Sequence, residues 1–387
     1  MWNPCLGPLP PHLAGHELVK AAWEGIDPSQ VWDAHAHLVG TGDSQSGIKL
    51  SPRMSSLFDP VEYVRRVFFL NAGCAQEGRV DESYIERMLD LVGEFRPGVK
   101  ILLFAFERAF DEKGAVRWDD TSFYVPDAHV RETAKRHSAI FEWVASIHPY
   151  RGDCVEALEE ARQGGARAVK WLPSAMGIDP GSPLCDRFYA AAARLDIPLI
   201  SHAGLERAVA GRDVQAWGNP LKLRRALDAG VRVVVAHCAS MGDDRDLDKG
   251  SNGPHVGSFE LFARMMEDRR YAGRLFGDIS AVTQTERAGI ALARILRAPD
   301  WQGRLLNGSD YPLPGLMPIF SLDYLVSMGL LDAAAAPVLS EIRRHNPMLF
   351  DFVAKRSLRL DGLRLQAALF ETRGFFDPLS RTAQKSR

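Results

Sequence analysis

Two histidines separated by one residue are the first sign of chemistry in this sequence. His35 and His37 lie in the segment 31–37, where apolar residues give way to an alternating pattern typical of a β-strand. Alternate side chains of a strand point to the same face, so both imidazoles can reach one metal ion. Because many strands end in histidines that bind nothing, this pair predicts a metal site only if further ligands follow.

Further candidate ligands stand at the ends of four later apolar segments: Lys170, His202, His237 and Asp310. Each has an ordinary structural explanation, such as an ion-paired lysine, a hydrogen-bonded histidine or an aspartate that forms a turn. Imidazoles and a carboxylate are, however, the ligands that zinc prefers. Their repeated occurrence at strand ends favours a joint site for a divalent metal ion.

A scaffold must bring these strand ends together. Strands are predicted at residues 31–37, 99–106, 141–148, 166–172, 197–202, 231–237, 275–280 and 304–310. Helices are predicted at residues 60–74, 81–95, 126–138, 154–164, 185–195, 220–229, 258–268 and 286–297, although residues 66–70 could equally form a strand. Eight apolar strands alternating with helices indicate a parallel sheet closed into a (β/α)8 TIM barrel, whose active sites lie at the carboxyl ends of the strands.

An open, doubly wound α/β sheet is the alternative fold. That fold usually carries a Gly-x-Gly-x-x-Gly turn after its first strand, and the sequence has none. We therefore expect a single barrel domain over residues 31–355 with long loops on its C-terminal face. Residues 1–30 would form an N-terminal extension, and residues 356–387 a C-terminal tail with a short hairpin around Asp361 and Gly362.

Composition narrows the class of partner. The chain of 387 residues has a net charge of −2, which gives no reason to expect nucleic acid or an anionic membrane as a partner. No apolar run is long enough to span a bilayer, and the N-terminus lacks the pattern of a signal peptide. The five cysteines are scattered and include no C-x-x-C, so we expect reduced thiols in a cytoplasmic protein.

Short motifs around the candidate ligands resemble the amidohydrolase superfamily. These are Ile-Ser-His-Ala-Gly at 200–204, Val-Val-Ala-His-Cys at 234–238 and Asn-Gly-Ser-Asp-Tyr-Pro at 307–312. The similarity covers roughly residues 31–350, and the lack of a flanking β-domain is typical of the branch that includes decarboxylases and lactone hydrolases. The resemblance implies a metal site with the ligands His35, His37, Lys170, His202, His237 and Asp310.

The resemblance also implies a mechanism. One or two divalent ions, most simply Zn²⁺, would activate a water molecule, and Asp310 would take its proton and pass it to the leaving group. His237 would bind a second ion or act as an acid/base. Lys170 would be carboxylated and bridge two ions, or, in a site with one ion, would form an ion pair or contact the substrate.

These expectations lead to one main hypothesis and two rivals. The main hypothesis is a metal-dependent hydrolase that cleaves an acyl C–N or C–O bond (amide, lactone or ester) of a small molecule. The first rival is a non-oxidative, metal-dependent decarboxylase on the same scaffold, and the second is a non-catalytic binding barrel. By analogy with related barrels, the chain could form a homo-oligomer.

Other residues receive lesser roles. Cations and one aromatic residue in the loops above the site could bind a carboxylate or phosphate of the substrate: Lys49, Arg53, Arg207, Arg212 and Trp217. His148 and Asp278 are interpreted as structural residues. Asp33 lies one layer below His35 on the same strand face, where it could support the ligands.

Overall fold

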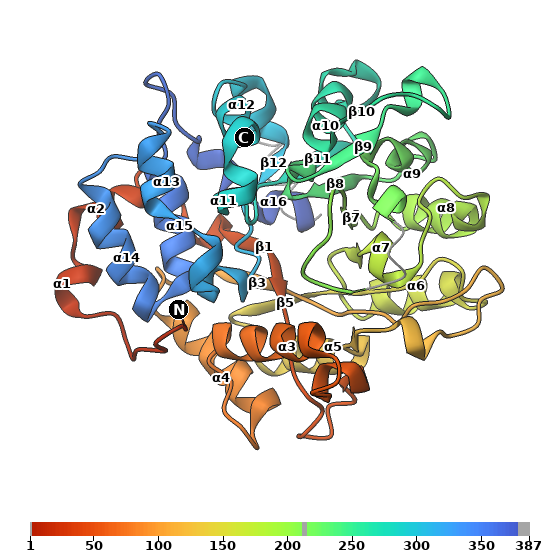
Figure 1. The fold of residues 1–387 in the computed structure, drawn as a ribbon, viewed down its shortest axis with the longest axis horizontal. Helices are drawn as coiled ribbons and strands as arrows, with labels where there is room; N and C mark the ends of the chain where they lie inside the picture. The colour runs from red at the N-terminus through yellow and green to blue at the C-terminus, as the bar shows by residue number, and fades with distance from the viewer. Residues whose placement is uncertain (1, 211–214, 378–387) are drawn as a thin grey trace.

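Eight parallel strands form the centre of the molecule. The computed structural model describes residues 2–210 and 215–377. The strands of the central sheet are β1 (Trp32–His37), β3 (Lys100–Phe104), β5 (Phe141–Val144), β6 (Val169–Trp171), β7 (Leu199–His202), β8 (Val233–Ala236), β11 (Leu275–Asp278) and β12 (Leu305–Leu306). All eight predicted strands are present, and they lie inside the ring of helices seen in Figure 1.

The strands form a closed barrel. Continuous ladders join β1, β3 and β5 in one arc, and β6, β7, β8, β11 and β12 in another. A parallel bridge between Ala145 and Val169 joins β5 to β6, and one between Ala36 and Tyr311 joins β1 to the chain after β12. The backbone N–H of Ala34 also donates to Asn307 O at 3.0 Å, so the ring closes between the first and the last strand.

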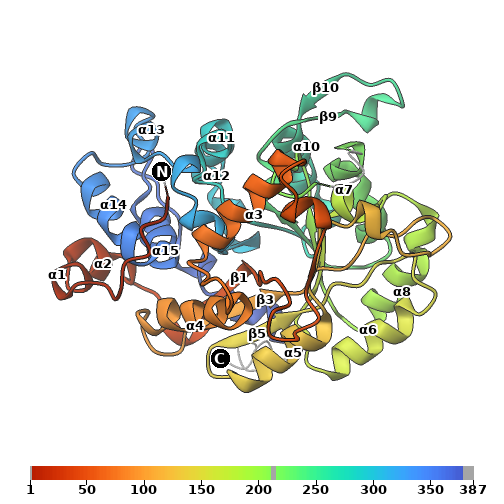
Figure 2. The same ribbon diagram turned by 60° about the horizontal axis from the view of Figure 1, so that its bottom comes forward.

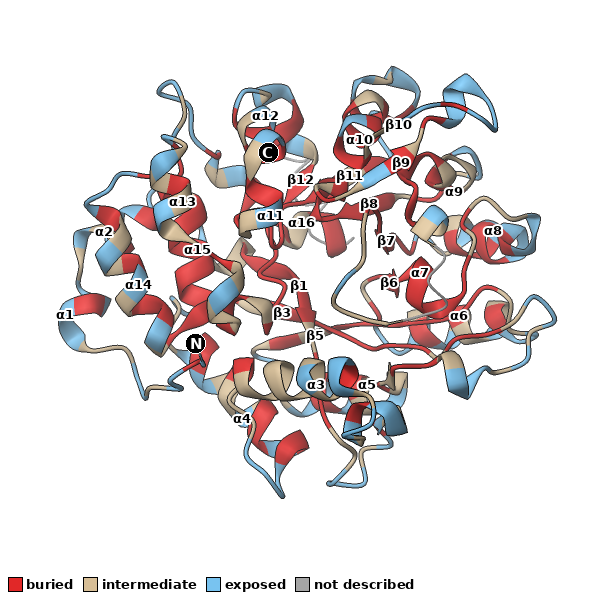
Figure 3. Ribbon diagram, viewed as in Figure 1, coloured by how far each residue is buried: buried red, intermediate tan, exposed pale blue. Residues whose placement is uncertain are grey.

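Helices cover the outside of the barrel (Figures 1 and 2). The longer ones are α3 (Pro60–Ala72), α4 (Val80–Gly93), α5 (Asp127–Arg136), α6 (Cys154–Gln163), α8 (Asp186–Arg194), α10 (Ser258–Glu267), α14 (Ala335–His345) and α15 (Pro347–Ser357). Each turns an apolar face inward, as α8 does with Phe188, whose ring lies 4.7 Å from that of Trp171 on β6. Figure 3 shows the strands buried and the outer helix faces exposed.

The structure decides one open alternative and corrects one predicted helix. Residues 66–70, which could have formed a strand, lie within helix α3. The predicted helix 286–297 is broken into α11 (Thr285–Arg287), a wide turn over 288–292 and α12 (Ala293–Leu296), because Gly289 has a non-helical backbone with φ of −21° and ψ of −119°. Glycine lacks the Cβ that would resist this conformation.

The C-terminal segment closes the amino end of the barrel. Helix α16 (Arg373–Phe376) places Phe375 and Phe376 in an apolar cluster with Trp32 and Leu306, which point into the barrel. Before it, Leu360 and Leu363 exchange two backbone hydrogen bonds across a tight turn, at the position predicted for a hairpin. Helix α15 runs to residue 357, so the expected boundary at 355 lies inside its last turn.

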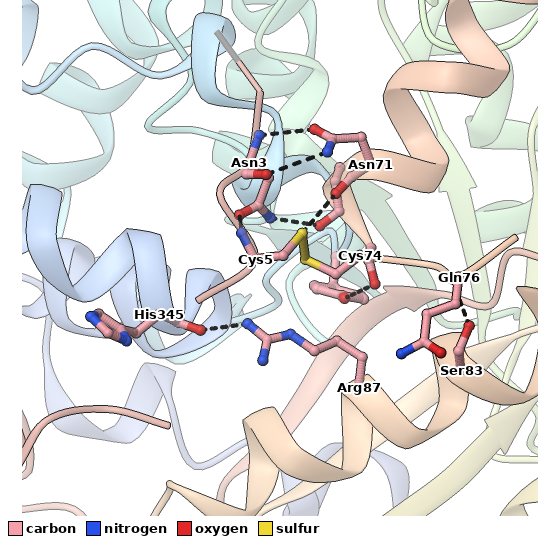
Figure 4. Close-up of a disulfide and its surroundings, with 11 residues drawn as sticks. Asn3, Cys5, Asn71, Cys74, Gln76, Ser83, Arg87 and His345 are labelled. Atoms are coloured by element: carbon pink, nitrogen blue, oxygen red, sulfur yellow. Dashed lines mark hydrogen bonds between the residues drawn. A yellow bond between two sulfur atoms is a disulfide. The ribbon is translucent and has the colours of Figure 1, made fainter. Parts of the chain in front are cut away.

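The prediction that all cysteines are reduced is wrong. Cys5 and Cys74 form a disulfide that ties the N-terminal segment to the end of α3, with Cα atoms 5.7 Å apart (Figure 4). Hydrogen bonds between Asn3 and Asn71 support the same crossing, one from Asn3 N to Asn71 Oδ1 at 2.8 Å. Cys154, Cys185 and Cys238 are buried and free. The expected cytoplasmic location rested on reduced thiols, so it stays a prediction.

Helices long and apolar enough to cross a bilayer are absent from residues 2–210 and 215–377.

Candidate active site

The structure brings all six predicted site residues into one pocket at the carboxyl ends of the strands. They come from five positions around the ring, namely β1, β6, β7 and the residues that follow β8 and β12. The pocket encloses about 830 Å³, counting space open to solvent, which is ample for a small molecule. The six are His35, His37, Lys170, His202, His237 and Asp310.

Four of these residues form a tight cluster at the floor of the pocket. The Nε2 atoms of His35 and His37 are 3.3 Å apart. Asp310 Oδ1 lies 3.2 Å from His37 Nε2 and 3.4 Å from His35 Nε2, and its Oδ2 lies 3.7 Å from His237 Nε2. Ligand atoms of His35, His237 and Asp310 all lie within 4.8 Å of one another, as the ligands of a single ion would.

Hydrogen bonds select one tautomer for two of these imidazoles. His35 Nδ1 lies 3.0 Å from Asp278 Oδ2, and His237 Nδ1 lies 3.0 Å from the carbonyl oxygen of Ser280. An ionised carboxylate and a carbonyl only accept, so each Nδ1 carries the proton and each Nε2 turns a lone pair toward the cluster. Lone pairs and a carboxylate that face each other at such distances repel unless a cation lies among them, so the donor set fits a divalent metal ion.

The backbone at the floor adopts unusual conformations that aim these side chains. His237 has φ of 54° and Asp310 has φ of 60°, the left-handed region that non-glycine residues seldom occupy. A backbone hydrogen bond stabilises each of these two conformations. His237 N donates to Asp278 Oδ1 at 3.0 Å, and Asp310 N donates to His35 O at 2.7 Å. At Gly308, a Cβ would lie 2.6 Å from that of His35, so only glycine lets the strands approach this closely.

Electrostatics give the cluster the protonation states that metal ligands need. Burial, reinforced by Lys170, lowers the pKa of His35 to about 4, and burial holds the pKa of His237 well below its ordinary value. Burial alone would raise the pKa of Asp310, but the imidazoles of His237, His35 and His37 outweigh it and hold that pKa well below its usual range. At neutral pH these two imidazoles are therefore neutral and the carboxylate is ionised.

Lys170 and His202 line the pocket beside this cluster. Lys170 Nζ lies 3.3 Å from His35 Nε2, and burial lowers the pKa of the amine to about 8. His202 Nε2 is buried and forms no hydrogen bond with any described residue, although Glu206 Oε2 lies 3.4 Å away. Burial lowers the pKa of His202 to about 4, so at neutral pH it is an uncharged imidazole in the pocket lining.

The walls of the pocket are mostly apolar. Rings and aliphatic side chains from α3 and from the loops after the strands surround the space above the floor, including Leu50, Phe69, Phe106, Phe123, Leu172 and Val209. Three charged side chains interrupt these walls: Arg66 on α3, Glu206 after β7 and Arg287 at the end of α11. The pocket therefore suits a ligand with an apolar body and few polar groups.

Of the three histidine and aspartate residues given lesser roles, two are structural and one contacts the imidazoles of the floor. His148 is structural, as expected, because its Nε2 donates to Met176 O at 2.9 Å and its Nδ1 accepts from Tyr150 N at 3.1 Å. Asp33 Oδ1 accepts from the backbone N–H groups of His35 and Ser309, so it supports the strands rather than an imidazole. Asp278 does more than the sequence suggested, since it contacts both His35 and His237.

The loop residues expected to bind the substrate lie elsewhere. Arg53 pairs with Asp59, and Arg207 pairs with Glu286 at 2.9 Å with its side chain 61% exposed. Lys49 lies over the ring of Trp118, and Trp217 is not part of the pocket lining. Arg212 lies outside the described residues. The charged residues of the pocket wall are instead ones that the sequence did not single out.

A local signal existed for some of the missed residues. Ser280 follows Asp278 by two residues, the spacing that places alternate side chains of a strand on one face, and Glu206 lies only four residues after His202. Ser280 Oγ lies 2.8 Å from His237 Nδ1 and 3.1 Å from His35 Nδ1. Nothing in the sequence separates Arg287 from the other arginines of these loops.

Comparisons with solved structures show to which proteins the chain is similar. The structure is similar to an uncharacterized TIM-barrel protein from Bordetella bronchiseptica, with a TM-score of 0.50 at 17% identity over 80% of this chain and 98% of that one. It is more distantly similar to a probable 2-pyrone-4,6-dicarboxylic acid hydrolase from Acinetobacter baumannii (TM-score 0.46, 12% identity, 83% and 97% covered). A third similar structure is 5-carboxyvanillate decarboxylase from Sphingomonas paucimobilis, with a TM-score of 0.43 at 13% identity over 76% of this chain and 94% of that one.

No curated protein matches the sequence. The amidohydrolase family model, in contrast, matches residues 32–347, from the first barrel strand to the start of α15. That span contains every residue of the cluster described above. The chain therefore belongs to the amidohydrolase family, and it is an enzyme of the metal-dependent hydrolase type.

Proposed function

We propose that the enzyme hydrolyses an acyl C–N or C–O bond of a small molecule, in an amide, a lactone or an ester. A divalent ion, most simply Zn²⁺, would be held by His35 and His37 together with Asp310, with His202 and His237 completing the set for one ion or two. The observation that carries this proposal is the convergence of imidazole lone pairs on an ionised carboxylate at the pocket floor.

Chemistry at this floor would divide between the ion and the side chains. A bound ion supplies a Lewis acid that polarises the acyl oxygen and makes water more acidic. Asp310, held ionised, orients the attacking water, accepts its proton and delivers that proton to the leaving nitrogen or oxygen. His237 Nε2, 3.7 Å from Asp310 Oδ2, binds the ion or exchanges the proton with Asp310. The apolar walls exclude bulk water from the acyl group.

Lys170 is compatible with two arrangements. A carboxylated Lys170 would bridge two ions, whereas an unmodified Lys170 would stay beside a single ion as a positive charge. Its Nζ, 3.3 Å from His35 Nε2, lies within reach of the cluster in both cases. The number of bound ions therefore distinguishes them.

The first experiment is elemental analysis of protein purified without chelator, beside Lys170→Ala. Two ions per chain that fall to one in the variant would indicate a bridged site, and one ion in both would make Lys170 a bystander. An absence of metal, with none taken up on reconstitution, would overturn the proposal.

Turnover is then measured on a panel of lactones, N-acyl amino acids and aryl esters. For any substrate cleaved, Asp310→Asn should lose about 10²- to 10⁴-fold in kcat, because the proton carrier is gone. The matched control is His148→Gln, a buried imidazole outside the pocket, which should keep kcat. Activity that survives Asp310→Asn would contradict the proton-carrying role assigned to Asp310, whereas a parent protein that cleaves no member of the panel would favour a binding function.

Non-oxidative decarboxylation is the second candidate. It is favoured by one observation, the buried cation Arg287 in the pocket wall, which could receive the carboxylate of an acid substrate. Release of carbon dioxide from aromatic acids, without cleavage of any member of the acyl panel, would decide for it.

A further inference from the structure

One wall of the pocket contains a buried guanidinium without an ionic partner. Arg287, at the end of α11, is 6% exposed and lines the same pocket as His202 and Glu206. Its Nε donates to Gln284 Oε1 at 3.0 Å and its Nη1 to Ser240 Oγ at 3.4 Å, both neutral acceptors. Within the part of the chain that the structure describes, no carboxylate oxygen lies within 4.0 Å of it.

The neighbouring carboxylates are engaged with other groups. Glu206 Oε1 accepts from the backbone N–H groups of Ala208 and Val209, at 2.5 and 3.0 Å, and its Oε2 faces His202. Asp310 faces the imidazoles of the floor. Neither carboxylate forms an ion pair with Arg287, so the guanidinium keeps N–H donors for a ligand.

Burying an arginine in this way is costly. A charged group removed from water loses its hydration, and an ion pair normally compensates. The nearby Arg207 shows the ordinary arrangement, because it is 61% exposed and pairs with Glu286, the residue next to Arg287. The cost at Arg287 is recovered if a bound molecule supplies the missing anion.

The rest of the pocket limits what that molecule can be. The rings of Phe106 and Phe123 pack 4.0 Å apart on the wall, and Leu172 and Val209 add aliphatic surface. Arg66, the other arginine of the lining, comes from helix α3 rather than from the strand ends. The ligand should therefore combine an apolar body with one anionic group.

We propose that Arg287 is the specificity-determining residue of this site: it binds an anionic group of the substrate, which is an apolar acyl compound that carries a carboxylate. Guanidinium and carboxylate form paired, charge-assisted hydrogen bonds that fix the orientation of the ligand as well as its affinity. The anion would lie at Arg287 and the acyl group at the floor. As a statement about substrate class, this inference rests on the proposed function, but anion binding by Arg287 does not.

The test uses two probes that differ in charge alone. These are 3-phenylpropane-1-sulfonate, an anion that binds metals weakly, and the neutral 3-phenylpropyl methyl sulfone. Calorimetric titration of the metal-containing protein should show at least about ten-fold tighter binding of the sulfonate, and Arg287→Met should remove that preference. Arg287→Lys should keep part of it, because the charge remains and the paired geometry is lost.

Two controls keep the result interpretable. Arg207→Met removes an exposed, paired arginine nearby and should keep the full preference. Equal binding of both probes by the unmodified protein, or a preference that survives Arg287→Met but disappears in Arg66→Met, would overturn the assignment. Metal content is measured separately and the titration is repeated on metal-free protein, where the preference attributed to Arg287 should persist, so a failure to bind metal and a failure of the Arg287 assignment are distinguishable.

Discussion

The floor of the pocket and its wall differ in how firmly they are built. Floor residues lie at the ends of barrel strands, all but His37 buried, and both His35 and His237 have a fixed hydrogen-bond partner. The wall is made of loops and of α3, and Val61 on α3 and Phe58 just before it are 62% and 100% exposed. Covalent support on the wall comes from the disulfide at the end of α3.

This difference teaches which part of the molecule sets which property. Packed strands hold a reactive group in one orientation, as a proton transfer requires. Loops and a peripheral helix can change their side chains without disturbing the barrel, so they determine which molecule enters. Perturbing one part should therefore leave the other nearly intact, and three experiments test this.

The largest effect on stability is expected from removing the disulfide that supports the wall. Cys5→Ser opens a link between residues 69 positions apart, and the chain-entropy relation assigns about 4 kcal/mol to a loop of that length. Urea unfolding should show a loss of about 2–4 kcal/mol, while the metal content stays unchanged. Reductant should destabilise the parent protein equally and Cys5→Ser hardly at all. Loss of metal on reduction would break the distinction between wall and floor.

The next largest effect is a loss of metal affinity when a hydrogen-bond partner of the floor imidazoles is replaced. Asp278→Asn replaces the carboxylate that holds His35 Nδ1 and His237 N, so metal affinity should fall about 10- to 100-fold in chelator competition. The probe preference attributed to Arg287 should remain. Asp244→Asn is the control, since Asp244 is also buried but bonds Ser258 outside the pocket. Equal metal affinity in Asp278→Asn and the parent would mean that packing alone orients the imidazoles.

The smallest effect is a pH dependence of stability that depends on Asp33, a buried carboxylate outside the pocket that bonds the backbone of two strand ends. Burial raises the pKa of Asp33 to about 6, so the folded protein keeps this proton over a range where the unfolded chain, with a pKa near 4, has lost it. The folded state therefore binds more protons, and its stability falls as pH rises from about 4 through 6. In metal-free protein, Asp33→Asn should flatten this decline by about 1–3 kcal/mol. An unchanged slope would place the titration elsewhere.

Much of the barrel and its floor could be predicted from the sequence, for local reasons. Apolar runs such as residues 231–237 form strands wherever they lie, and parallel strands meet with their carboxyl ends at one face. His35, His202 and Asp310 were therefore predicted to converge without knowledge of any distance. The assignment of their roles stays a prediction.

Features that depend on how distant segments cross could not be predicted. Cys5 meets Cys74 only because the N-terminal segment passes over the end of α3, which no spacing reveals. Arg287 lies buried in the pocket wall, two residues before the break of the helix at Gly289, and neither the break nor the burial could be foreseen from the sequence. Before the fold was known, it resembled the exposed Arg207.

The contact between the first and the last strand of the barrel sets the order in which the site can be assembled. Asp33 Oδ1 accepts from Ser309 N, a contact between residues 276 positions apart, and the two halves of the ion cluster lie on either side of it. During synthesis, His35 emerges early and Asp310 late, so a growing chain cannot offer the full donor set to an ion. Metal binding would then follow closure of the barrel. The bound ion would stabilise the folded barrel relative to the unfolded chain, by an amount that grows with its affinity and concentration.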